Sequence, residues 1–485
     1  MIDFLKKFGC YSFGSVMTLA AGLISFPIFT RMLTPADYGL LSLVNLTGAL
    51  CITFSKGGLQ QALLREWDAT RGENRVVVST ALFGSLMITL ALCAVCGTAA
   101  LLLSYARGSF SYLLLFLVTA GVVITETVKS IIYNKIRAMH RALKYNALSI
   151  SSKYGQIALA VLFMSWFGAS AYSVLAGFIA ASIVVIVWML YEERRAISAA
   201  SFDRSTFKGM LGFGFPLIFY ELNTQALNFF DRYLIGYFRG AEAVGIYSAA
   251  YNLTFYVQNL LVSTVSLTIY PMIVEVLKKE GYAAARELIR DSLLWFTLVG
   301  SAAALGFAAL GADIFILTAS RKYAEAAPVI APVICGSFFY GVFTVAASEL
   351  FVQKSTRSMA LMVGVAALGN ILLNLVLIPS LGLIGAAYAT LACDAFLAAL
   401  GLWKLGAFAG TCGIPLALQH LVPSLVMYGV LRGMPGHLSW GSVLLRTAAG
   451  FSVWLGVALV LNRSARKRLG ALLGKVKSVS CGSAT

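Results

Sequence analysis

The chain has 485 residues, of which 59% are hydrophobic and only 12% are charged. A soluble domain needs a far more highly charged surface, so this balance excludes a soluble protein and indicates a membrane protein. The net charge of +17 does not predict a nucleic-acid partner, because the basic residues lie between apolar runs, where membrane topology places them.

Apolar runs recur along the whole sequence, and each is long enough to cross about 30 Å of hydrocarbon as a helix. We therefore expect an all-α polytopic membrane protein with about 14 transmembrane helices and no loop long enough for a soluble active site. In chain order, the predicted spans are residues 9–31, 38–64, 76–104, 110–134, 145–167, 170–191, 209–238, 244–274, 291–318, 326–352, 358–379, 382–403, 416–431 and 440–462.

The basic residues orient these spans. If the amino terminus is cytoplasmic and the spans alternate, most Lys and Arg fall in cytoplasmic segments and only six fall in external ones. This asymmetry is the positive-inside rule, so we expect both termini in the cytoplasm. The basic tail after residue 462 either anchors the last span or lies on anionic lipid.

The sequence repeats weakly with an offset of six spans. "YGLLSL" (Tyr38 to Leu43) opens the second span, and "VGIYSA" (Val244 to Ala249) opens the eighth. Such an offset predicts two parallel six-helix bundles with a substrate path at their interface. The expected domains are an N-terminal bundle at 1–195, a C-terminal bundle at 196–410, and two extra spans with the basic tail at 411–485.

Charged and polar residues inside a membrane are costly, so each one marks a candidate functional site. In the seventh span, Gln225, Asn228 and Arg232 fall within about 40° of Glu221 around the helix, because helical residues are about 100° apart. Asp231 lies on the edge of this polar stripe. Arg232 either snorkels to the outer interface or faces a cavity, and the shared face favours the cavity.

Two other spans carry polar groups with more than one interpretation. Tyr247, Tyr251 and Gln258 share a face of the eighth span, either to line a cavity or to form hydrogen bonds between helices. In the fourth span, Glu126 and Lys129 have the spacing of a helical pair. They can bind each other and still line a cavity.

Three single charges complete the set of candidates. Lys56 precedes Gly57 and Gly58 in the second span, and it either snorkels to the cytoplasmic side or faces a cavity. Asp394 lies near the middle of the twelfth span, with no neighbouring base in its helix, and is a candidate for proton binding. Arg446 in the last span is either structural or lines a groove.

Several other chemistries lack their motifs. "GALLGK" (Gly470 to Lys475) is one residue short of a P-loop and is not followed by Ser or Thr. The three His residues show no metal-ligand spacing, and Cys93 and Cys96 lie among Ala and Leu inside a span. We therefore expect no metal, no cofactor and no enzymatic activity.

Four stretches together resemble a known family. They are "RMLTPADYGLLSL", "GGLQQALLREWD", "FDRYLIGYFRGAEAVGIYSAAYN" and "GNILLNLVLIPSLGLIGAAYATL". In order and spacing they are similar to bacterial Wzx-type oligosaccharide flippases, which share a superfamily with lipid II flippases and MATE exporters. The resemblance covers the first twelve spans. It implies two bundles in a V around a cationic cavity, with two additional helices bordering a groove for a lipid tail.

The resemblance also implies a function. The substrate would be an undecaprenyl-diphosphate-linked oligosaccharide for O-antigen or exopolysaccharide, flipped across the inner membrane by a monomer, with a polymerase and a chain-length regulator as partners. Cations would bind the diphosphate, and amides and aromatic rings would bind the sugar. The candidate substrate residues are Arg232, Lys56, Lys129, Arg31, Gln225, Asn228, Tyr247, Tyr251 and Gln258, and the candidates for ion coupling are Glu221, Asp231, Asp394 and Glu126.

Two other function classes are alternatives to a flippase. A cation-coupled MATE-like exporter of small cations would have an acid-dominated cavity, and the roughly balanced acids and bases leave this alternative open. A membrane-embedded glycosyltransferase or polymerase would need a sizeable external loop with acidic residues, and no predicted loop is long enough.

Overall fold

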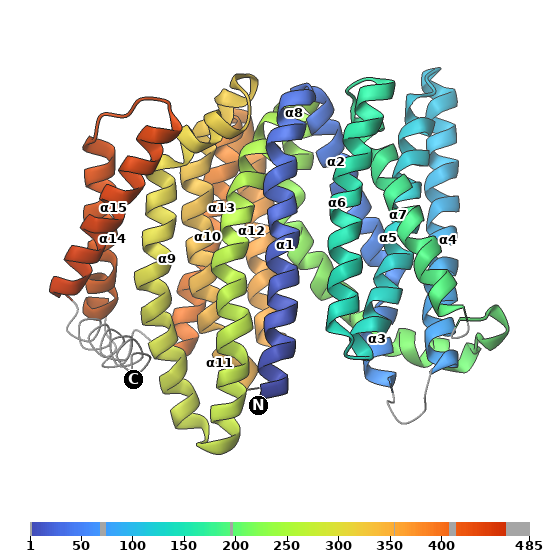
Figure 1. The fold of residues 1–485 in the computed structure, drawn as a ribbon, viewed down its shortest axis with the longest axis horizontal. Coiled ribbons are helices and arrows are strands. Elements are labelled where there is room, and N and C mark those ends of the chain that lie inside the picture. Colours follow the sequence, from blue (N-terminus) through green and yellow to red (C-terminus); the bar gives the residue numbers. More distant parts are fainter. Residues whose placement is uncertain (1, 68–73, 195–196, 354, 407–413, 462–485) are drawn as a thin grey trace, which may run out of the picture. The chain divides into compact units, whose positions relative to one another are not determined.

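The computed structural model describes residues 2–67, 74–194, 197–353, 355–406 and 414–461. For a subset of these it describes the backbone alone: residues 2–12, 220, 224, 226–228, 260–261, 263–268, 271, 351, 356 and 414–419. Within the described ranges the chain is helical and contains no strand (Figure 1).

Helices cover all the predicted spans. They are α1 (Ile2–Met32), α2 (Pro35–Lys56), α3 (Leu59–Glu66), α4 (Arg75–Arg107), α5 (Ser111–Ala138), α6 (Ala142–Phe167), α7 (Ala171–Glu193), α8 (Arg204–Lys279), α9 (Tyr282–Thr318), α10 (Ile330–Ala346), α11 (Ser348–Val352), α12 (Thr356–Leu381), α13 (Leu383–Leu405), α14 (Ile414–Gly433) and α15 (Trp440–Leu461), with 3-10 turns η2 (Ala199–Ser201) and η3 (Arg321–Val329). Among the described residues, 11 helices are long and apolar enough to cross a membrane. The other predicted spans fall on α8 and α14. The prediction of an all-α multi-pass membrane protein is confirmed.

One predicted span differs from the structure, and glycine explains the difference. The second span is broken into α2 and α3 by Gly57 and Gly58, whose φ angles of 57° and 70° are left-handed. Only glycine adopts such angles without strain. The seventh and eighth predicted spans are two helices that share the label α8 and meet at a kink at Gly240 (φ 85°), where the backbone is not helical, so the predicted division between them is confirmed.

The stretch "TPAD" starts α2 and attaches it to a neighbour. Thr34 caps the helix by accepting a hydrogen bond from the Asp37 N–H at 3.1 Å, and Pro35 occupies the first turn, where its missing N–H costs nothing. The Asp37 carboxylate also accepts a hydrogen bond from the backbone N–H of Ala171 at 3.2 Å. One acidic side chain therefore joins the starts of α2 and α7.

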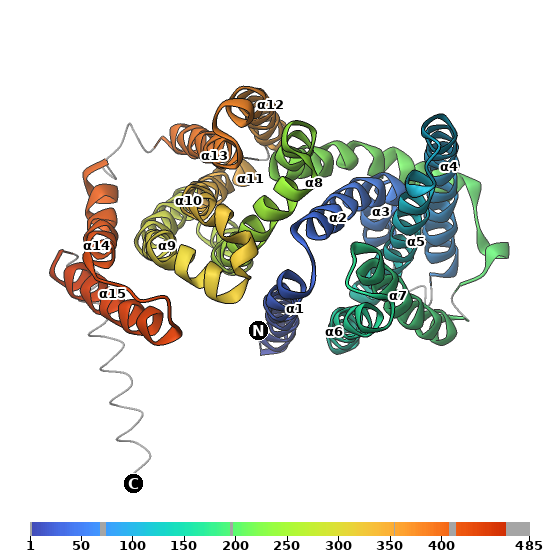
Figure 2. The ribbon, with the colours of Figure 1, turned by 90° about the horizontal axis from the view of Figure 1, so that it is seen from above.

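The contacts within the chain divide it into two units, Met1–Ser248 and Ala249–Thr485. Unit 1 contains α1 to α7 and α8 as far as Ser248. Its central helix is α5, which packs against α2, α3, α4, α6 and α7 (Figure 2). The candidate residues of the second, fourth and seventh spans all belong to this unit.

Unit 2 repeats the packing of unit 1. The neighbours α4 with α5, α5 with α7, and α6 with α7 correspond to α9 with α10, α10 with α13, and α12 with α13. These are the pairs that an offset of six spans predicts, so the packing supports the sequence repeat. The domain boundaries expected near residues 195 and 410 stay a prediction.

The last two helices, α14 and α15, pack against α9 in unit 2 (Figure 2). Arg446 of α15 pairs with Asp313 of α9 at 2.7 Å and donates to the Leu431 carbonyl of α14 at 3.2 Å. Arg446 is therefore a structural link among three helices. Beside it, an apolar cavity of about 410 Å³ lies between these helices and is walled by Phe451 and Trp454, among others.

Candidate functional site

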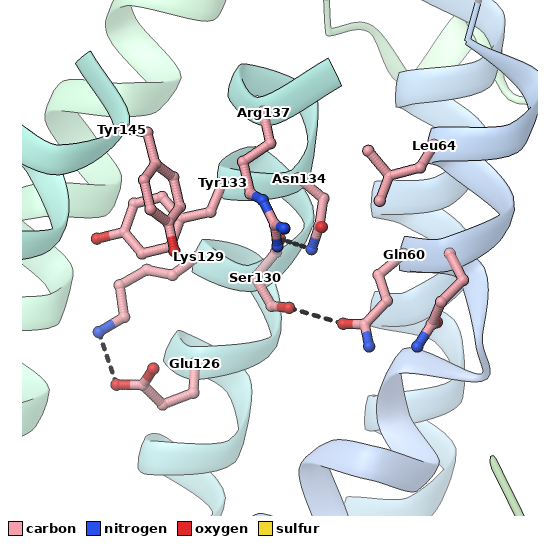
Figure 3. A pocket seen from close by; sticks show the side chains of 10 residues that line it. Gln60, Leu64, Glu126, Lys129, Ser130, Tyr133, Asn134, Arg137 and Tyr145 are labelled. Atoms are coloured by element: carbon pink, nitrogen blue, oxygen red, sulfur yellow. Dashed lines mark hydrogen bonds and ion pairs between the residues drawn. The ribbon is translucent and has the colours of Figure 1, made fainter. Parts of the chain in front are cut away.

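A polar cavity of about 400 Å³ opens in unit 1 where α3 faces α5 and the start of α6 (Figure 3). Amides, hydroxyl groups and aromatic rings make up most of its wall. The lining residues are Gln60, Gln61, Leu64, Glu126, Lys129, Ser130, Tyr133, Asn134, Arg137 and Tyr145.

One wall of the cavity is held by the carboxylate of Glu221 on α8. Glu221 accepts hydrogen bonds from the side-chain amides of Gln61 at 2.6 Å and Gln60 at 3.1 Å. Lys56, the last residue of α2, lies 3.7 Å from the other carboxylate oxygen. The break between α2 and α3 therefore brings three side chains onto one acidic group.

The same break allows α3 to approach α8 at backbone distance. A Cβ atom on Gly58 would collide with the backbone of Gly214, and one on Gly214 would collide with Gly58. Glycine at both positions lets α3 and α8 touch, and this contact places Gln60 and Gln61 within reach of Glu221.

Gln60 also connects α3 to α5 across the cavity. Its amide oxygen accepts a hydrogen bond from the Ser130 hydroxyl at 2.9 Å (Figure 3). One turn further along α5, the Asn134 amide donates to the Ser130 carbonyl at 2.8 Å. Polar groups thus continue from Glu221 through Gln60 to Ser130 and Asn134.

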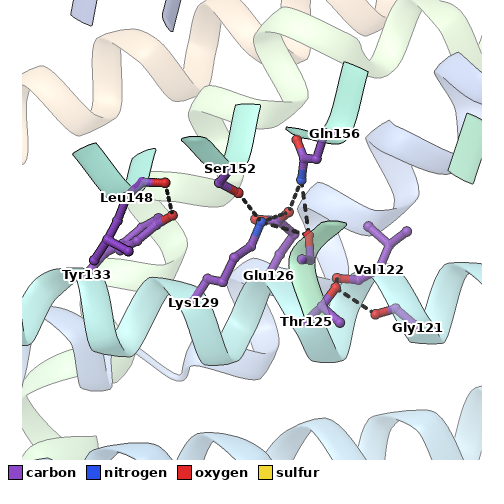
Figure 4. Close-up of polar contacts among 10 residues, drawn as sticks. Gly121, Val122, Thr125, Glu126, Lys129, Tyr133, Leu148, Ser152 and Gln156 are labelled. Carbon is purple, nitrogen blue, oxygen red and sulfur yellow. Dashed lines mark hydrogen bonds and ion pairs between the residues drawn. The ribbon is translucent and has the colours of Figure 1, made fainter. Parts of the chain in front are cut away.

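The opposite wall contains a paired charge. Lys129 binds Glu126 at 2.6 Å, which confirms the pairing that their spacing on α5 predicts. Lys129 also donates to Ser152 of α6 at 3.3 Å and to Ser182 of α7 at 2.9 Å, while Gln156 donates to Glu126 at 3.1 Å (Figure 4). Because Lys129 is only 3% exposed, these bonds also join α5 to α6 and α7 in the interior of the unit.

Aromatic rings form the third part of the wall. The rings of Tyr133 and Tyr145 meet edge to face with centroids 5.6 Å apart. The guanidinium of Arg137 lies 5.9 Å from the centroid of the Tyr145 ring. An aromatic face beside amide groups is a surface to which the C–H face of a sugar ring can bind while the amides take its hydroxyl groups.

Asp231 and Arg232 lie within unit 1 and outside the lining of this cavity. They are 2% and 1% exposed, respectively. Asp231 accepts hydrogen bonds from the Tyr247 hydroxyl at 2.6 Å and from the Arg232 backbone N–H at 2.8 Å. The Arg232 guanidinium lies 5.0 Å from the centroid of the Phe229 ring. The predicted contact of Arg232 with substrate stays a prediction.

The remaining candidate residues are distributed over both units. In unit 1, Gln225 is half-buried and Arg31 is exposed, whereas the side chain of Asn228 lies outside those that the structure describes. In unit 2, Tyr251 and Gln258 of α8 and Asp394 of α13 are buried at 3%, 8% and 6% exposure. The cavity thus brings together Lys129 and Glu126 and, through the two glutamines, Glu221 and Lys56.

Sequence reasoning did not single out most of the residues that line the cavity. Gln60 and Gln61 form a polar pair one residue after Gly57 and Gly58, and that signal could have identified them. Arg137 and Tyr145 carry no such signal, because in the sequence they belong to the ends of spans, where basic and aromatic residues are common.

The arrangement suits the binding of a polar ligand. Among the described residues, no group of three or more His, Cys, Asp or Glu side chains could hold a metal ion. The lining offers several neutral donors and acceptors, one aromatic wall and one paired charge. A hydroxyl-rich ligand could satisfy these groups.

A family model described as "Polysaccharide biosynthesis protein" matches residues 4–277 of the chain. No curated protein matches this chain. Among solved structures, the lipid II flippase MurJ in an inward closed conformation aligns with a TM-score of 0.76 at 17% identity, covering 94% of this chain and 99% of that chain.

Two other transporters of the MOP superfamily are also similar to this chain. An inward-facing multidrug resistance MATE family transporter has a TM-score of 0.63 at 13% identity, covering 87% of this chain and 96% of its own. A transporter from Pyrococcus furiosus has a TM-score of 0.57 at 14% identity, covering 84% and 97%. At such identities the likeness shows the fold alone, and it confirms the expected resemblance of the fold to those of MurJ and MATE family transporters.

Proposed function

The chain belongs to the polysaccharide biosynthesis protein family, and from this premise we propose that it is a flippase for undecaprenyl-diphosphate-linked oligosaccharide repeat units. It moves them from the cytoplasmic to the periplasmic leaflet of a bacterial inner membrane by alternating access. The product supplies a cell-surface polysaccharide such as O-antigen or exopolysaccharide.

The observation that carries this proposal is the wall of the polar cavity in unit 1. Its glutamines, Asn134 and Ser130 offer donors and acceptors to sugar hydroxyl groups, and Tyr145 offers a ring face. With both termini in the cytoplasm, the ends of α3 and α5 that form this cavity lie on the cytoplasmic side, where the substrate is made. The apolar cavity between α9, α14 and α15 would accept part of the prenyl tail.

Reconstituted transport tests the proposal. The full chain is placed in proteoliposomes with a fluorescent prenyl-diphosphate-linked sugar, and a membrane-impermeant quencher reports which leaflet holds the probe. We expect the wild type to move the probe and protein-free liposomes to leave it in place. Arg232→Ala tests the predicted substrate contact of Arg232, and unchanged transport by that variant would remove Arg232 from the mechanism.

The energy source is tested in the same vesicles. Ion coupling would use buried or half-buried carboxylates, because these can bind a proton or sodium ion inside the membrane. The candidates are Glu221, Asp231, Asp394 and Glu126. Dissipation of an imposed pH or sodium gradient slows transport if one of these ions is coupled, and has no effect if the substrate gradient alone drives flipping.

The second candidate function is a cation-coupled exporter of small cations, favoured by the structural likeness to MATE family transporters. The same vesicles loaded with a fluorescent cationic dye separate the two. Dye transport with no movement of the sugar probe would replace the flippase proposal. The monomeric state and the association with a polymerase and a chain-length regulator are further parts of the proposal, and pull-down of the full chain from membranes tests them.

A further inference from the structure

We propose that Arg137 binds the negatively charged group of the substrate in the polar cavity. This inference rests on the proposed function and assigns the contacts within it. The ligand chemistry is an oxyanion next to hydroxyl groups, as in a sugar diphosphate or an acidic sugar.

The charges around the cavity isolate Arg137. Glu126 and Lys129 line the cavity and neutralise each other at 2.6 Å. Behind the wall, Glu221 pairs with Lys56 at 3.7 Å. Among the described residues no carboxylate lies within ion-pair distance of Arg137, whose guanidinium stacks near Tyr145. The cavity therefore presents one uncompensated positive charge.

The guanidinium group is suited to this role. Its planar fork can form two parallel hydrogen bonds to a phosphate or carboxylate, and contact with an aromatic face leaves the N–H edge available. Figure 3 shows the Arg137 side chain extending along α5 toward Asn134 and Ser130, into the space that faces Gln60. An anion bound there would lie between α5 and α3.

Two of the other candidate cations of unit 1, Lys129 and Arg232, are less available. Lys129 is 3% exposed and bound to Glu126, and Arg232 is 1% exposed beside Phe229. Burial of this kind fixes a side chain in place. Arg137, by contrast, is exposed at the cavity.

Binding of soluble probes to the purified full chain tests the inference. The probes are a short-chain prenyl-diphosphate-linked N-acetylglucosamine, an alkyl glucuronide and a neutral alkyl galactoside. The variants are Arg137→Gln, Arg137→Lys and, as a matched control, Arg65→Gln. Arg65 also stacks on an aromatic ring, Phe213 at 4.4 Å, but does not line the cavity. Thermal melting of each variant verifies that it is folded.

We expect Arg137→Gln to weaken binding of at least one anionic probe about ten- to a hundredfold, with the galactoside unchanged, because one charge-assisted contact is lost. Arg137→Lys should restore part of the affinity, and Arg65→Gln should bind as the wild type does. If Arg137→Gln loses binding of the diphosphate probe alone, Arg137 contacts the diphosphate linker. If it loses binding of the glucuronide alone, Arg137 contacts an acidic sugar.

Unchanged binding of both anionic probes by Arg137→Gln would overturn the inference, and so would a wild type that binds neither. The flipping assay separates this result from failure of the proposed function. If the wild type flips the sugar probe while Arg137→Gln binds and flips it equally well, only the role of Arg137 is wrong. If the wild type flips no prenyl-diphosphate sugar, the proposed function itself fails.

Discussion

Ser42 of α2 donates a hydrogen bond to Ser248 of α8 at 2.8 Å, and the two serines occupy the same place in the two halves of the sequence repeat. Gly39 and Gly245 are also equivalent, and each packs against the backbone of the other helix, where a Cβ atom would collide. Equivalent residues of the two sequence repeats thus contact each other, as they do in a two-fold symmetric interface.

This symmetric contact predicts a strong effect of a single methyl group. Gly39→Ala should lower the free energy of unfolding by about 1–3 kcal/mol, because the added methyl overpacks a backbone contact. Gly212→Ala is the matched control, since its Cβ atom would meet open space in α8. That change should be neutral or stabilising by up to about 1 kcal/mol from helix propensity. Thermal melting in detergent that ranks the two variants equally would contradict this contact.

Tyr247 and Tyr233 provide a comparison of a charged and a neutral hydrogen bond. Tyr247 donates to the buried Asp231 carboxylate at 2.6 Å, across the kink at Gly240, whereas Tyr233 shares a bond with the Thr47 hydroxyl at 2.8 Å. We expect Tyr247→Phe to cost about 1.5–3 kcal/mol and Tyr233→Phe about 0.5–1.5 kcal/mol, because bonds to charged groups contribute more. Denaturant unfolding in micelles measures both, and a smaller loss for Tyr247→Phe would count against the bond to Asp231.

Glu221 positions the two glutamines of the cavity. Glu221→Gln keeps the size of the side chain but removes the charge that pairs with Lys56 and the acceptor shared by Gln60 and Gln61. We expect a loss of about 1–3 kcal/mol in stability, since the pair is half-buried, together with weaker binding of a neutral glycoside. Glu66→Gln, an exposed position on α3, is the control. A variant with unchanged glycoside affinity would show that the glutamines do not need Glu221.

Asp203, which lies between two predicted spans, should make the stability of the protein depend on pH. Its carboxylate accepts hydrogen bonds from the Ser205 hydroxyl at 2.6 Å and the Thr206 N–H at 2.7 Å, ahead of α8, and these bonds hold the pKa of Asp203 well below its ordinary value. Because the pKa of Asp203 is lower in the folded than in the unfolded state, these bonds contribute fully to stability above about pH 4. Their contribution is lost as the pH falls through the folded pKa.

Asp203→Asn tests this linkage, because an asparagine still caps the helix but does not titrate. Below about pH 4 the Tm of the wild type should fall more steeply than that of Asp203→Asn. Parallel curves over that range would show that Asp203 contributes nothing that depends on its charge.

The sequence alone predicted the local and periodic features. Apolar run lengths predicted helices that the structure contains, and the spacing of Glu126 and Lys129 predicted their ion pair. Its error was also local: Gly57 and Gly58 break a predicted span, whereas the predicted division near Gly240 is present as a kink between two helices. A glycine permits a left-handed φ but does not require a particular one, so the neighbouring packing determines the outcome.

Tertiary structure alone decided which helix faces meet. Helical periodicity determines which residues of one helix share a face, and the stripe through Glu221 was visible for that reason. It does not determine which face of another helix lies opposite, because that depends on close packing summed over many contacts, such as Gly58 against Gly214. Hence the sequence showed that Glu221 and Lys56 were candidates, and only the fold joined them through Gln60 and Gln61 to a cavity beside Arg137.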